Sequence, residues 1–217
     1  LNVDATGRML AVANYHAGST LSYPIHEDGT LGEAASVMKH QGSSINEKRQ
    51  DGPHPHSVNF SPDNRFLISA DLGADKLYVY LTDPATARLK PNDPPTASIK
   101  PGGGPRHLTF HPSSQFCYVI NELGNTITVF KWDVEYGTMK EIQMISTLPG
   151  GFNESNTTAE ILVHPSGNFL YGSNRGHDSI AVFSIDPASG KLTIIEHAPT
   201  QGRTPRNFNL DPNGKYL

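Results

Sequence analysis

The chain has 217 residues and a formal net charge of −4, and 18% of its residues are charged, with no run of Lys or Arg. This balance excludes an extended nucleic-acid footprint and a surface for anionic membranes. No stretch approaches the roughly 18 apolar residues of a membrane helix, and the single cysteine, Cys117, excludes an internal disulfide and favours a reducing compartment.

Taken in chain order, the predicted elements begin with a phrase at residues 3–14, which reads as an apolar strand, a turn and a second β-rich strand. The phrase returns three times and starts a fifth time, at residues 60–71, 110–121, 163–174 and 210–214. The turn positions are Ala5, Pro62, Pro112, Pro165 and Pro212, spaced by 57, 50, 53 and 47 residues. A period of this length is typical of propeller blades.

Each complete copy continues into a third β-rich strand, as at residues 76–80, 126–130 and 179–183. A turn rich in Asp, Gly and Thr follows, and after the last of these turns a fourth strand is predicted at residues 191–195. Four short antiparallel strands per roughly 50 residues make one blade. The sequence therefore predicts an all-β fold, a β-propeller of four-stranded antiparallel blades, with about four to four and a half blades present. We expect residues 1–217 to be one partial domain, a fragment of a single larger propeller domain.

Hairpin geometry predicts that the start of the innermost strand and the end of the second strand share one face of each blade. Six and five positions upstream of the turn proline, the polar residues are His56, Ser57, Arg106, His107, Glu160, Arg206 and Asn207. Nine to twelve positions downstream, they include Asn14, Tyr15, Asp71, Asn121, Glu122, Asn174, Arg175 and His177. We therefore expect most of the conspicuous His, Arg and Glu side chains to gather at one mouth of the propeller.

Structural roles compete with functional ones at several of these positions. A polar residue repeats at Asn14, Asp71, Asn121 and Asn174, which favours turn caps, whereas Arg106, Glu122 and Arg175 do not repeat in kind, which favours function. His54 and His56 could belong to the site or could pack the entrance of a strand. His111 and His164 fall beside the opposite turn and are expected to be solvated, and Cys117 is expected to be a buried strand residue.

Other kinds of site are not indicated. No spacing typical of a zinc site occurs, and arginines at the same mouth would repel a cation, so we predict no metal and no cofactor. A serine hydrolase would need a Gly-x-Ser-x-Gly turn, which the chain lacks. Three glycines at residues 102–104 precede a strand and not a helix, which argues against a phosphate-binding loop.

Six phrases, in order along the chain, resemble the seven-bladed β-propeller lactonase family, which includes bacterial 6-phosphogluconolactonases and fungal 3-carboxy-cis,cis-muconate lactonising enzymes. They are Val12-Ala13-Asn14-Tyr15-His16, Gly52-Pro53-His54-Pro55-His56-Ser57, Gly103-Gly104-Pro105-Arg106-His107, Ile120-Asn121-Glu122, Ser173-Asn174-Arg175-Gly176-His177-Asp178-Ser179 and Thr204-Pro205-Arg206-Asn207. The resemblance implies seven blades in the complete protein and a metal-independent, cytoplasmic enzyme with its site at the channel mouth.

The resemblance also implies the site residues. The catalytic residues proposed for the lactonising branch fall on His56, Arg106, Glu122 and Arg175. We predict substrate-binding roles for His54, His107, Glu160, His177, Arg206 and Asn207.

The resemblance implies hydrolysis of 6-phospho-D-glucono-1,5-lactone to 6-phosphogluconate, in the pentose phosphate pathway. One alternative is a carboxy-muconate cycloisomerase with the same site, and another is a non-catalytic propeller that binds a protein partner. We expect a small anionic lactone or sugar phosphate as the partner, with no nucleic acid and no membrane. The sequence makes no prediction of the oligomeric state.

Overall fold

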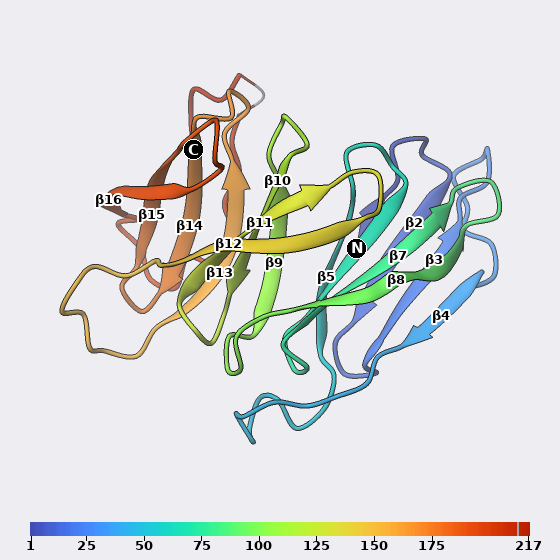
Figure 1. Ribbon diagram of the computed structural model, residues 1–217, viewed down its shortest axis with the longest axis horizontal. Coiled ribbons are helices and arrows are strands. Elements are labelled where there is room, and N and C mark those ends of the chain that lie inside the picture. The colour runs from blue at the N-terminus through green and yellow to red at the C-terminus, as the bar shows by residue number, and fades with distance from the viewer. Residues whose placement is uncertain (212) are drawn as a thin grey trace. The chain divides into compact units, whose positions relative to one another are not determined.

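The structure is a computed structural model that describes residues 1–211 and 213–217. Pro212, the turn position of the fifth copy, lies outside the described residues. The described residues form 16 strands and no helix, and the strands make four antiparallel sheets of four strands each (Figure 1). The predicted fold class, an all-β fold of four-stranded antiparallel blades, is confirmed.

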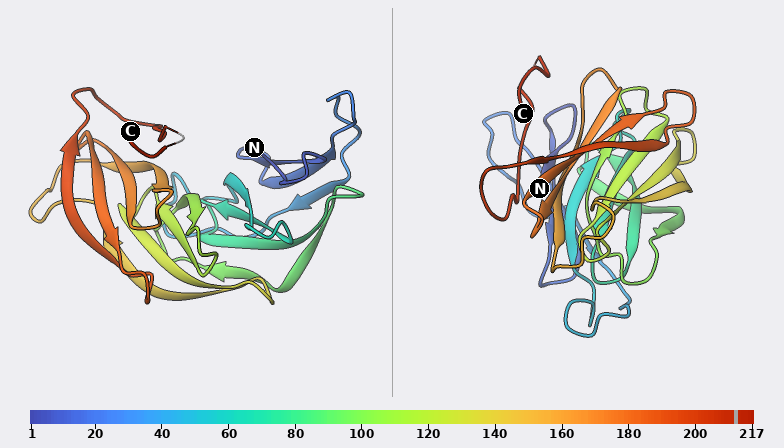
Figure 2. Two further views of the ribbon diagram at one scale, coloured as in Figure 1. Left: turned by 90° about the horizontal axis from the view of Figure 1, so that it is seen from above. Right: turned by 90° about the vertical axis from the view of Figure 1, so that its left-hand side faces the viewer.

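Each blade follows the chain from its innermost to its outermost strand. The first blade contains β1 (Asn2–Val3), β2 (Met9–Asn14), β3 (Ser19–Pro24) and β4 (Ser36–Lys39). The second contains β5 (Pro55–Phe60), β6 (Phe66–Asp71), β7 (Lys76–Asp83) and β8 (Arg88–Ser98). The third contains β9 (Pro105–Phe110), β10 (Phe116–Asn121), β11 (Thr126–Asp133) and β12 (Thr138–Ser146). The fourth contains β13 (Thr157–Val163), β14 (Phe169–Arg175), β15 (Ser179–Ile185) and β16 (Leu192–Pro199). Figure 2 shows the fourth blade, in orange to red, from two further sides.

The chain divides into two compact units. The first contains Leu1–Arg106 and Val134–Thr138, and the second contains His107–Asp133 and Met139–Leu217. The first unit has a core of buried residues that includes Met9, Val58, Leu67, Tyr80 and Leu89, so it joins the first blade to the second. The second unit has a core that includes Phe116, Tyr118, Ile161, Leu170 and Phe183, so it joins the third blade to the fourth.

Burial follows the position of a strand within its blade. All six residues of β6 and all six of β10 are buried, which fits the mainly apolar sequences of these two second strands, whereas β2 and β14 also contain half-buried residues. Cys117 lies in β10, is fully buried as predicted, and has a thiol pKa raised by that burial. The outer strand β12 contains only exposed and half-buried residues.

Two histidines at the opposite turns correct a prediction from the sequence. His111 is 8% exposed, and its Nδ1 accepts the backbone N–H of Ser113 at 3.0 Å while its Nε2 donates to the carbonyl of Gly167 at 2.9 Å. His164 repeats the arrangement with Ser166 at 3.1 Å and with the carbonyl of Gly214 at 2.9 Å. The expectation of a solvated ring was wrong for His111, because its ring reaches the turn of the following repeat, whereas His164 makes the same kind of contact and is half-buried.

The fifth copy of the repeat forms no strand among the described residues after β16. It does close the predicted turn, since the N–H of Gly214 donates to the carbonyl of Asp211 at 2.8 Å.

Candidate functional site

The predicted hairpin geometry is present in both units. In the second blade Pro55, at the start of β5, pairs with Asp71, at the end of β6. In the fourth blade Thr157, at the start of β13, pairs with Arg175, at the end of β14. The innermost strand therefore begins where the second strand ends, as the sequence predicted.

His56 occupies an irregular position of β5. The register shifts between Pro55 and Ser57, so His56 is an extra residue in the ladder, and its ring lies edge-on to Tyr15 with 5.8 Å between centroids. Bulges of this kind re-aim a side chain and are frequent beside active sites. The ladder irregularity thus gives His56 a direction that the regular alternation of a strand would not.

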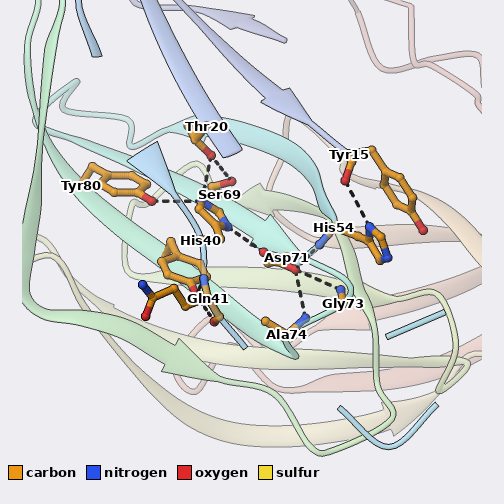
Figure 3. A network of polar contacts seen from close by, with 11 residues as sticks. Tyr15, Thr20, His40, Gln41, His54, Ser69, Asp71, Gly73, Ala74 and Tyr80 are labelled. Atoms are coloured by element: carbon orange, nitrogen blue, oxygen red, sulfur yellow. Dashed lines mark hydrogen bonds and ion pairs between the residues drawn. The ribbon is translucent and has the colours of Figure 1, made fainter. Parts of the chain in front are cut away.

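His54 is held on both sides. Its ring stacks on Tyr15 with 4.5 Å between centroids, and its Nδ1 lies 3.1 Å from the Tyr15 carbonyl (Figure 3). Its Nε2 lies 3.1 Å from Asp51 Oδ1. Both ring nitrogens therefore face acceptor oxygens, which ties the segment before β5 to the end of β2.

Asp71 organises the turn between β6 and β7. Its Oδ1 accepts the backbone N–H groups of His54 at 2.8 Å and of Gly73 and Ala74 at 3.0 Å each, while the Nδ1 of His40 donates to Oδ2 at 2.7 Å (Figure 3). Asp71 and the His40 side chain have no exposure, so these donors replace the water that a carboxylate would otherwise need. The structural role predicted for Asp71 is confirmed.

Asn121 and Asn174 also have structural roles, although by other bonds. Asn121 Nδ2 donates to the hydroxyls of Thr126 at 3.0 Å and Thr128 at 2.9 Å. Asn174 Nδ2 donates to the carbonyl of Thr147 at 2.8 Å, and its Oδ1 accepts the hydroxyl of the same threonine at 2.7 Å. An amide both donates and accepts, so these positions bond side chains and carbonyls where Asp71 bonds turn N–H groups.

Arg106 is the second residue of β9 and is 2% exposed. Arginine is almost never this deeply buried unless its charge is compensated, so the burial of Arg106 is unusual for its residue type. Arg106 ends the first unit, and His107, the next residue, begins the second.

Glu122 and Arg175 form a buried ion pair in the second unit. Arg175 Nη2 lies 3.1 Å from Glu122 Oε2, and the two side chains are 11% and 5% exposed. The same nitrogen donates to the carbonyl of Thr158 at 2.7 Å, and the N–H of Thr158 donates to the carbonyl of Glu122 at 3.2 Å. Among the described residues, Arg175 Nε is buried without a hydrogen-bond partner. The third and fourth blades therefore meet in a charged pair that keeps one N–H donor unused.

A second cluster surrounds Glu160, which lies where the register of β13 shifts between Thr158 and Ile161. His107 Nδ1 lies 2.8 Å from Glu160 Oε1, and Asn207 Nδ2 donates to Oε2. The N–H of Ile161 also donates to Oε1 at 3.1 Å. Three of the predicted substrate-binding residues, far apart in sequence, thus contact one another through one carboxylate.

The contacts described for His177 and Arg206 do not include residues of these two clusters. His177 bonds Ser179 through Nδ1 at 2.7 Å and lies edge-on to Phe152 and His197, with 4.9 and 5.6 Å between ring centroids. Desolvation lowers the pKa of His197 and outweighs the hydrogen bond to the Thr147 carbonyl, which raises it. Arg206 is exposed in the segment after β16.

His40 and Asp75 take part in this architecture and were not singled out by the sequence. His40 follows β4 and bonds Thr20 and Tyr80 through Nε2 at 3.1 and 3.0 Å (Figure 3). One feature of the sequence could have indicated a partner such as His40. Position 71 holds Asp where the other three copies hold Asn, and a buried carboxylate needs additional hydrogen-bond donors.

Within residues 1–211 and 213–217, no three His, Cys, Asp or Glu side chains are grouped closely enough to hold a metal ion. The same residues include no helix with the length and apolar character needed to span a membrane.

Comparison with known proteins places these clusters in context. The sequence profile of the family described as "Lactonase, 7-bladed beta-propeller" matches residues 1–217. A 6-phosphogluconolactonase of Bacillus subtilis is 37% identical over 223 residues, which cover 100% of this chain and 61% of that protein. A 6-phosphogluconolactonase of Formosa agariphila is 34% identical, over 100% of this chain and 62% of its own length.

Two solved structures are similar at comparable identity. The periplasmic gluconolactonase PpgL of Pseudomonas aeruginosa has a TM-score of 0.91 at 36% identity, covering 98% of this chain and 60% of that one. A protein of Lactobacillus plantarum has a TM-score of 0.92 at 35% identity, with the same coverage. The chain spans about 60% of the length of the relatives that it matches.

Proposed function

Because the chain belongs to the seven-bladed β-propeller lactonase family, we propose that the protein hydrolyses 6-phospho-D-glucono-1,5-lactone to 6-phosphogluconate, a reaction of the pentose phosphate pathway. Relatives named 6-phosphogluconolactonase at 37% and 34% identity support the proposal. Four of the seven blades are present in this chain, so the proposal concerns the protein that contains them.

The buried pair of Glu122 and Arg175 is the observation that carries the proposal. A buried guanidinium with a partnerless Nε–H is a donor ready for an anionic oxygen, and lactone hydrolysis both uses an anionic substrate and develops an oxyanion. The planar Arg fork binds carboxylate and phosphate oxygens better than a Lys ammonium does. Glu122 holds that fork in place before the substrate arrives.

The chemical roles follow from the residue types. Water attacks the lactone carbonyl, and a cationic donor stabilises the negative charge that develops on the carbonyl oxygen; Arg106 has this role in the proposal. Glu122 or His56 accepts the proton of the attacking water, a contribution of typically 10² to 10⁴ in rate. Opening of the ester then releases the ring oxygen as an alcohol, which takes up a proton.

The remaining residues bind substrate. Arg175 and Arg206 hold phosphate oxygens, since a phosphorylated substrate needs charge compensation at some distance from the carbonyl. His107 is oriented by its Nδ1–H bond to Glu160, and Asn207 fixes the other oxygen of the same carboxylate. These contacts support a preorganised polar surface for the sugar hydroxyls, and His54 and His177 keep their substrate-binding roles in the proposal.

A cytoplasmic location belongs to the proposal, because the pathway is cytoplasmic and Cys117 is a free buried thiol. The Pseudomonas relative is described as periplasmic, which makes fractionation of the source cells informative. We expect the full-length protein in the soluble cytoplasmic fraction, and its recovery with periplasmic markers would refute this part.

The test measures hydrolysis of 6-phospho-D-glucono-1,5-lactone and of unphosphorylated glucono-1,5-lactone, and cyclisation of 3-carboxy-cis,cis-muconate, by the full-length protein. We expect the highest kcat/KM on the phosphorylated lactone, above the spontaneous rate. The gluconolactone is included because the Pseudomonas relative bears that name. A higher kcat/KM on gluconolactone would make the unphosphorylated lactone the substrate. Turnover of the muconate would make the reaction a cycloisomerisation, and no turnover of any of the three compounds would refute the proposal.

A further inference from the structure

One residue of each blade has the same unusual conformation. The turn between the second and third strands ends in a residue with a left-handed backbone, and we name these four the corner residues: Gly18, Asp75, Asn125 and Asp178, with φ of 60°, 51°, 51° and 54°. Only Gly adopts this region without strain, and Asn and Asp tolerate it better than other residues. The same strained position is therefore kept in all four blades.

The backbone carbonyl of each corner residue receives the chain as it leaves the outermost strand. The N–H groups that donate to Gly18, Asp75, Asn125 and Asp178 belong to His40 at 2.9 Å, Ile99 at 2.9 Å, Thr147 at 3.0 Å and Thr200 at 3.0 Å. In each of the four blades, one hydrogen bond thus fixes the outgoing chain to the corner residue of the same blade.

The other side of each corner residue contacts the segment that leads into the next copy of the repeat, which is β5 for Gly18, β9 for Asp75, β13 for Asn125 and the fifth copy for Asp178. Asn125 Oδ1 accepts Nδ2 of Asn156 at 2.8 Å, and Asp178 Oδ1 accepts the N–H of Thr204 at 2.8 Å. At Gly18, which has no side chain, Pro53 packs so closely that an added Cβ would lie 3.2 Å from the Pro53 carbonyl oxygen. Each corner residue therefore contacts its own blade and the lead-in of the following one.

Asp75 makes the strongest of these connections. Its Oδ2 accepts the N–H of Gly102 at 2.6 Å and its Oδ1 accepts the N–H of Gly104 at 2.6 Å. Both glycines have left-handed backbones, with φ of 82° and 65°, and glycine loses more conformational freedom on folding than other residues do. The carboxylate is 4% exposed and occupies the N–H groups that a phosphate-binding loop would offer to a ligand.

The residues that follow the lead-ins are the predicted site residues. His56 comes three positions after Pro53, Arg106 two positions after Gly104, and Arg206 two positions after Thr204. We propose that the corner residues are positioning residues of the site, and that Asp75, by binding Gly102 and Gly104 at once, sets where Arg106 presents its guanidinium. The inference rests on the proposed lactonase function for its catalytic consequence, while its structural part stands on the contacts alone.

The test replaces Asp75 by Asn in the full-length protein. Asn replaces one of the two carboxylate oxygens of Asp75 by an NH₂ group, which then faces the N–H that this oxygen accepted, so one bond is lost. We expect amide exchange at Gly102 and Gly104 to become about tenfold faster. We expect kcat on the lactone to fall about tenfold or more with a much smaller change in KM, because Arg106 acts on the transition state.

Two other variants separate positioning from general destabilisation. Asp4→Asn removes a buried carboxylate that accepts the N–H groups of Thr6, Arg8 and Met9 at the opposite end of the first blade. It should lower the melting temperature without changing kcat. Asp178→Asn keeps the single oxygen that Thr204 needs, so exchange at Thr204 should change far less than exchange at Gly104 does in Asp75→Asn.

Each result has a defined meaning. Wild-type kcat in Asp75→Asn, or an equal loss of kcat in Asp4→Asn, would overturn the positioning role. If the wild-type protein turns over no lactone, the proposed function fails, and the exchange measurement still decides the structural part. Unchanged exchange at both glycines would overturn that part as well.

Discussion

At the scale of single residues, a buried ion pair joins the third and fourth blades. Arg175 extends from the end of β14 to Glu122, which follows β10, and both side chains are largely buried. Removal of one member of such a pair leaves the other charge buried and uncompensated, which costs more than the loss of an exposed salt bridge.

Glu122→Gln tests this pair, since it keeps the shape of the side chain and removes its charge. We expect the free energy of unfolding to fall by about 2–4 kcal/mol, because Arg175 stays buried beside a neutral amide. We expect kcat to fall about a hundredfold. Urea unfolding and lactone assays measure the two effects. Glu141→Gln, at an exposed position of β12 in the same blade, is the matched control and should change neither.

The sequence could rank these residues but could not place their partners. Unrepeated charge at a repeated position indicated Glu122 and Arg175, and the structure brings them together. The burial of His111 was missed because its partner, the carbonyl of Gly167, lies 56 positions away and leaves no local signal. A ring beside a turn reads as solvated unless the neighbouring repeat is known to approach it.

At the scale of elements, the turns between second and third strands connect neighbouring blades through their hydrogen bonds. The β6–β7 turn follows Asp71, whose carboxylate accepts the N–H of His54, and ends at Asp75, whose carboxylate accepts the N–H groups of Gly102 and Gly104. One short turn therefore fixes the starts of two innermost strands, β5 and β9.

Gly73→Ala tests how closely this turn meets the lead-in of β5. An added Cβ would lie 1.9 Å from the carbonyl oxygen of Gly52 and 2.9 Å from the amide nitrogen of His54, so the backbone must move. We expect a loss of about 1–3 kcal/mol in unfolding free energy, of the size seen when a well-packed site is overfilled. Gly52→Ala is the control, because its Cβ would meet nothing within 4 Å. Equal urea midpoints for the two variants would contradict the expectation.

The strands themselves were predictable in unequal measure. Second and third strands, such as β10 and β11, follow from continuous or alternating apolar residues. The outer strand β8 does not, because it contains three prolines, at Pro91, Pro94 and Pro95, and proline weakens a strand assignment. Such residues are tolerated at the edge of a sheet, where one side of the ladder has no partner strand to bond.

At the scale of the whole molecule, repetition of one blade plan explains why the fold was readable from a single sequence. Turn prolines at near-regular spacing fix the period, and the hairpin rule then assigns each polar residue to one end of its blade. The arrangement within each blade follows from that rule. The identity of the contacts between blades does not, because it depends on side chains that differ from copy to copy.

Stability of the molecule in acid is predicted to depend on Asp4. Burial alone would raise the pKa of Asp4, but hydrogen bonds from Thr6, Asn64 and Met9 outweigh it and lower the pKa to about 2. A carboxyl with a lowered pKa in the folded state stabilises above its unfolded pKa, near 4, and loses that contribution as the pH falls towards 2. The contribution is on the order of 2 kcal/mol.

Urea unfolding of the wild type and of Asp4→Asn at pH 7 and pH 2 measures it. The wild type should lose more stability than the variant between the two values, so the gap between the two proteins should narrow in acid. If the difference in unfolding free energy between the two proteins were the same at pH 7 and pH 2, the charge of Asp4 would not be the source of that difference.

The bonds of His111 and His164 to the next glycine set a rule for recombining this protein. Each histidine needs a glycine at the partner position, because a Cβ at Gly167 would come within 2.7 Å of the His111 ring and one at Gly214 within 2.5 Å of the His164 ring. A chimaera that imports a foreign blade must therefore carry a compatible turn on both of its borders. Crossovers are tolerated where histidine and glycine travel together, and a cut between them creates a steric mismatch that no repacking of the imported core can relieve.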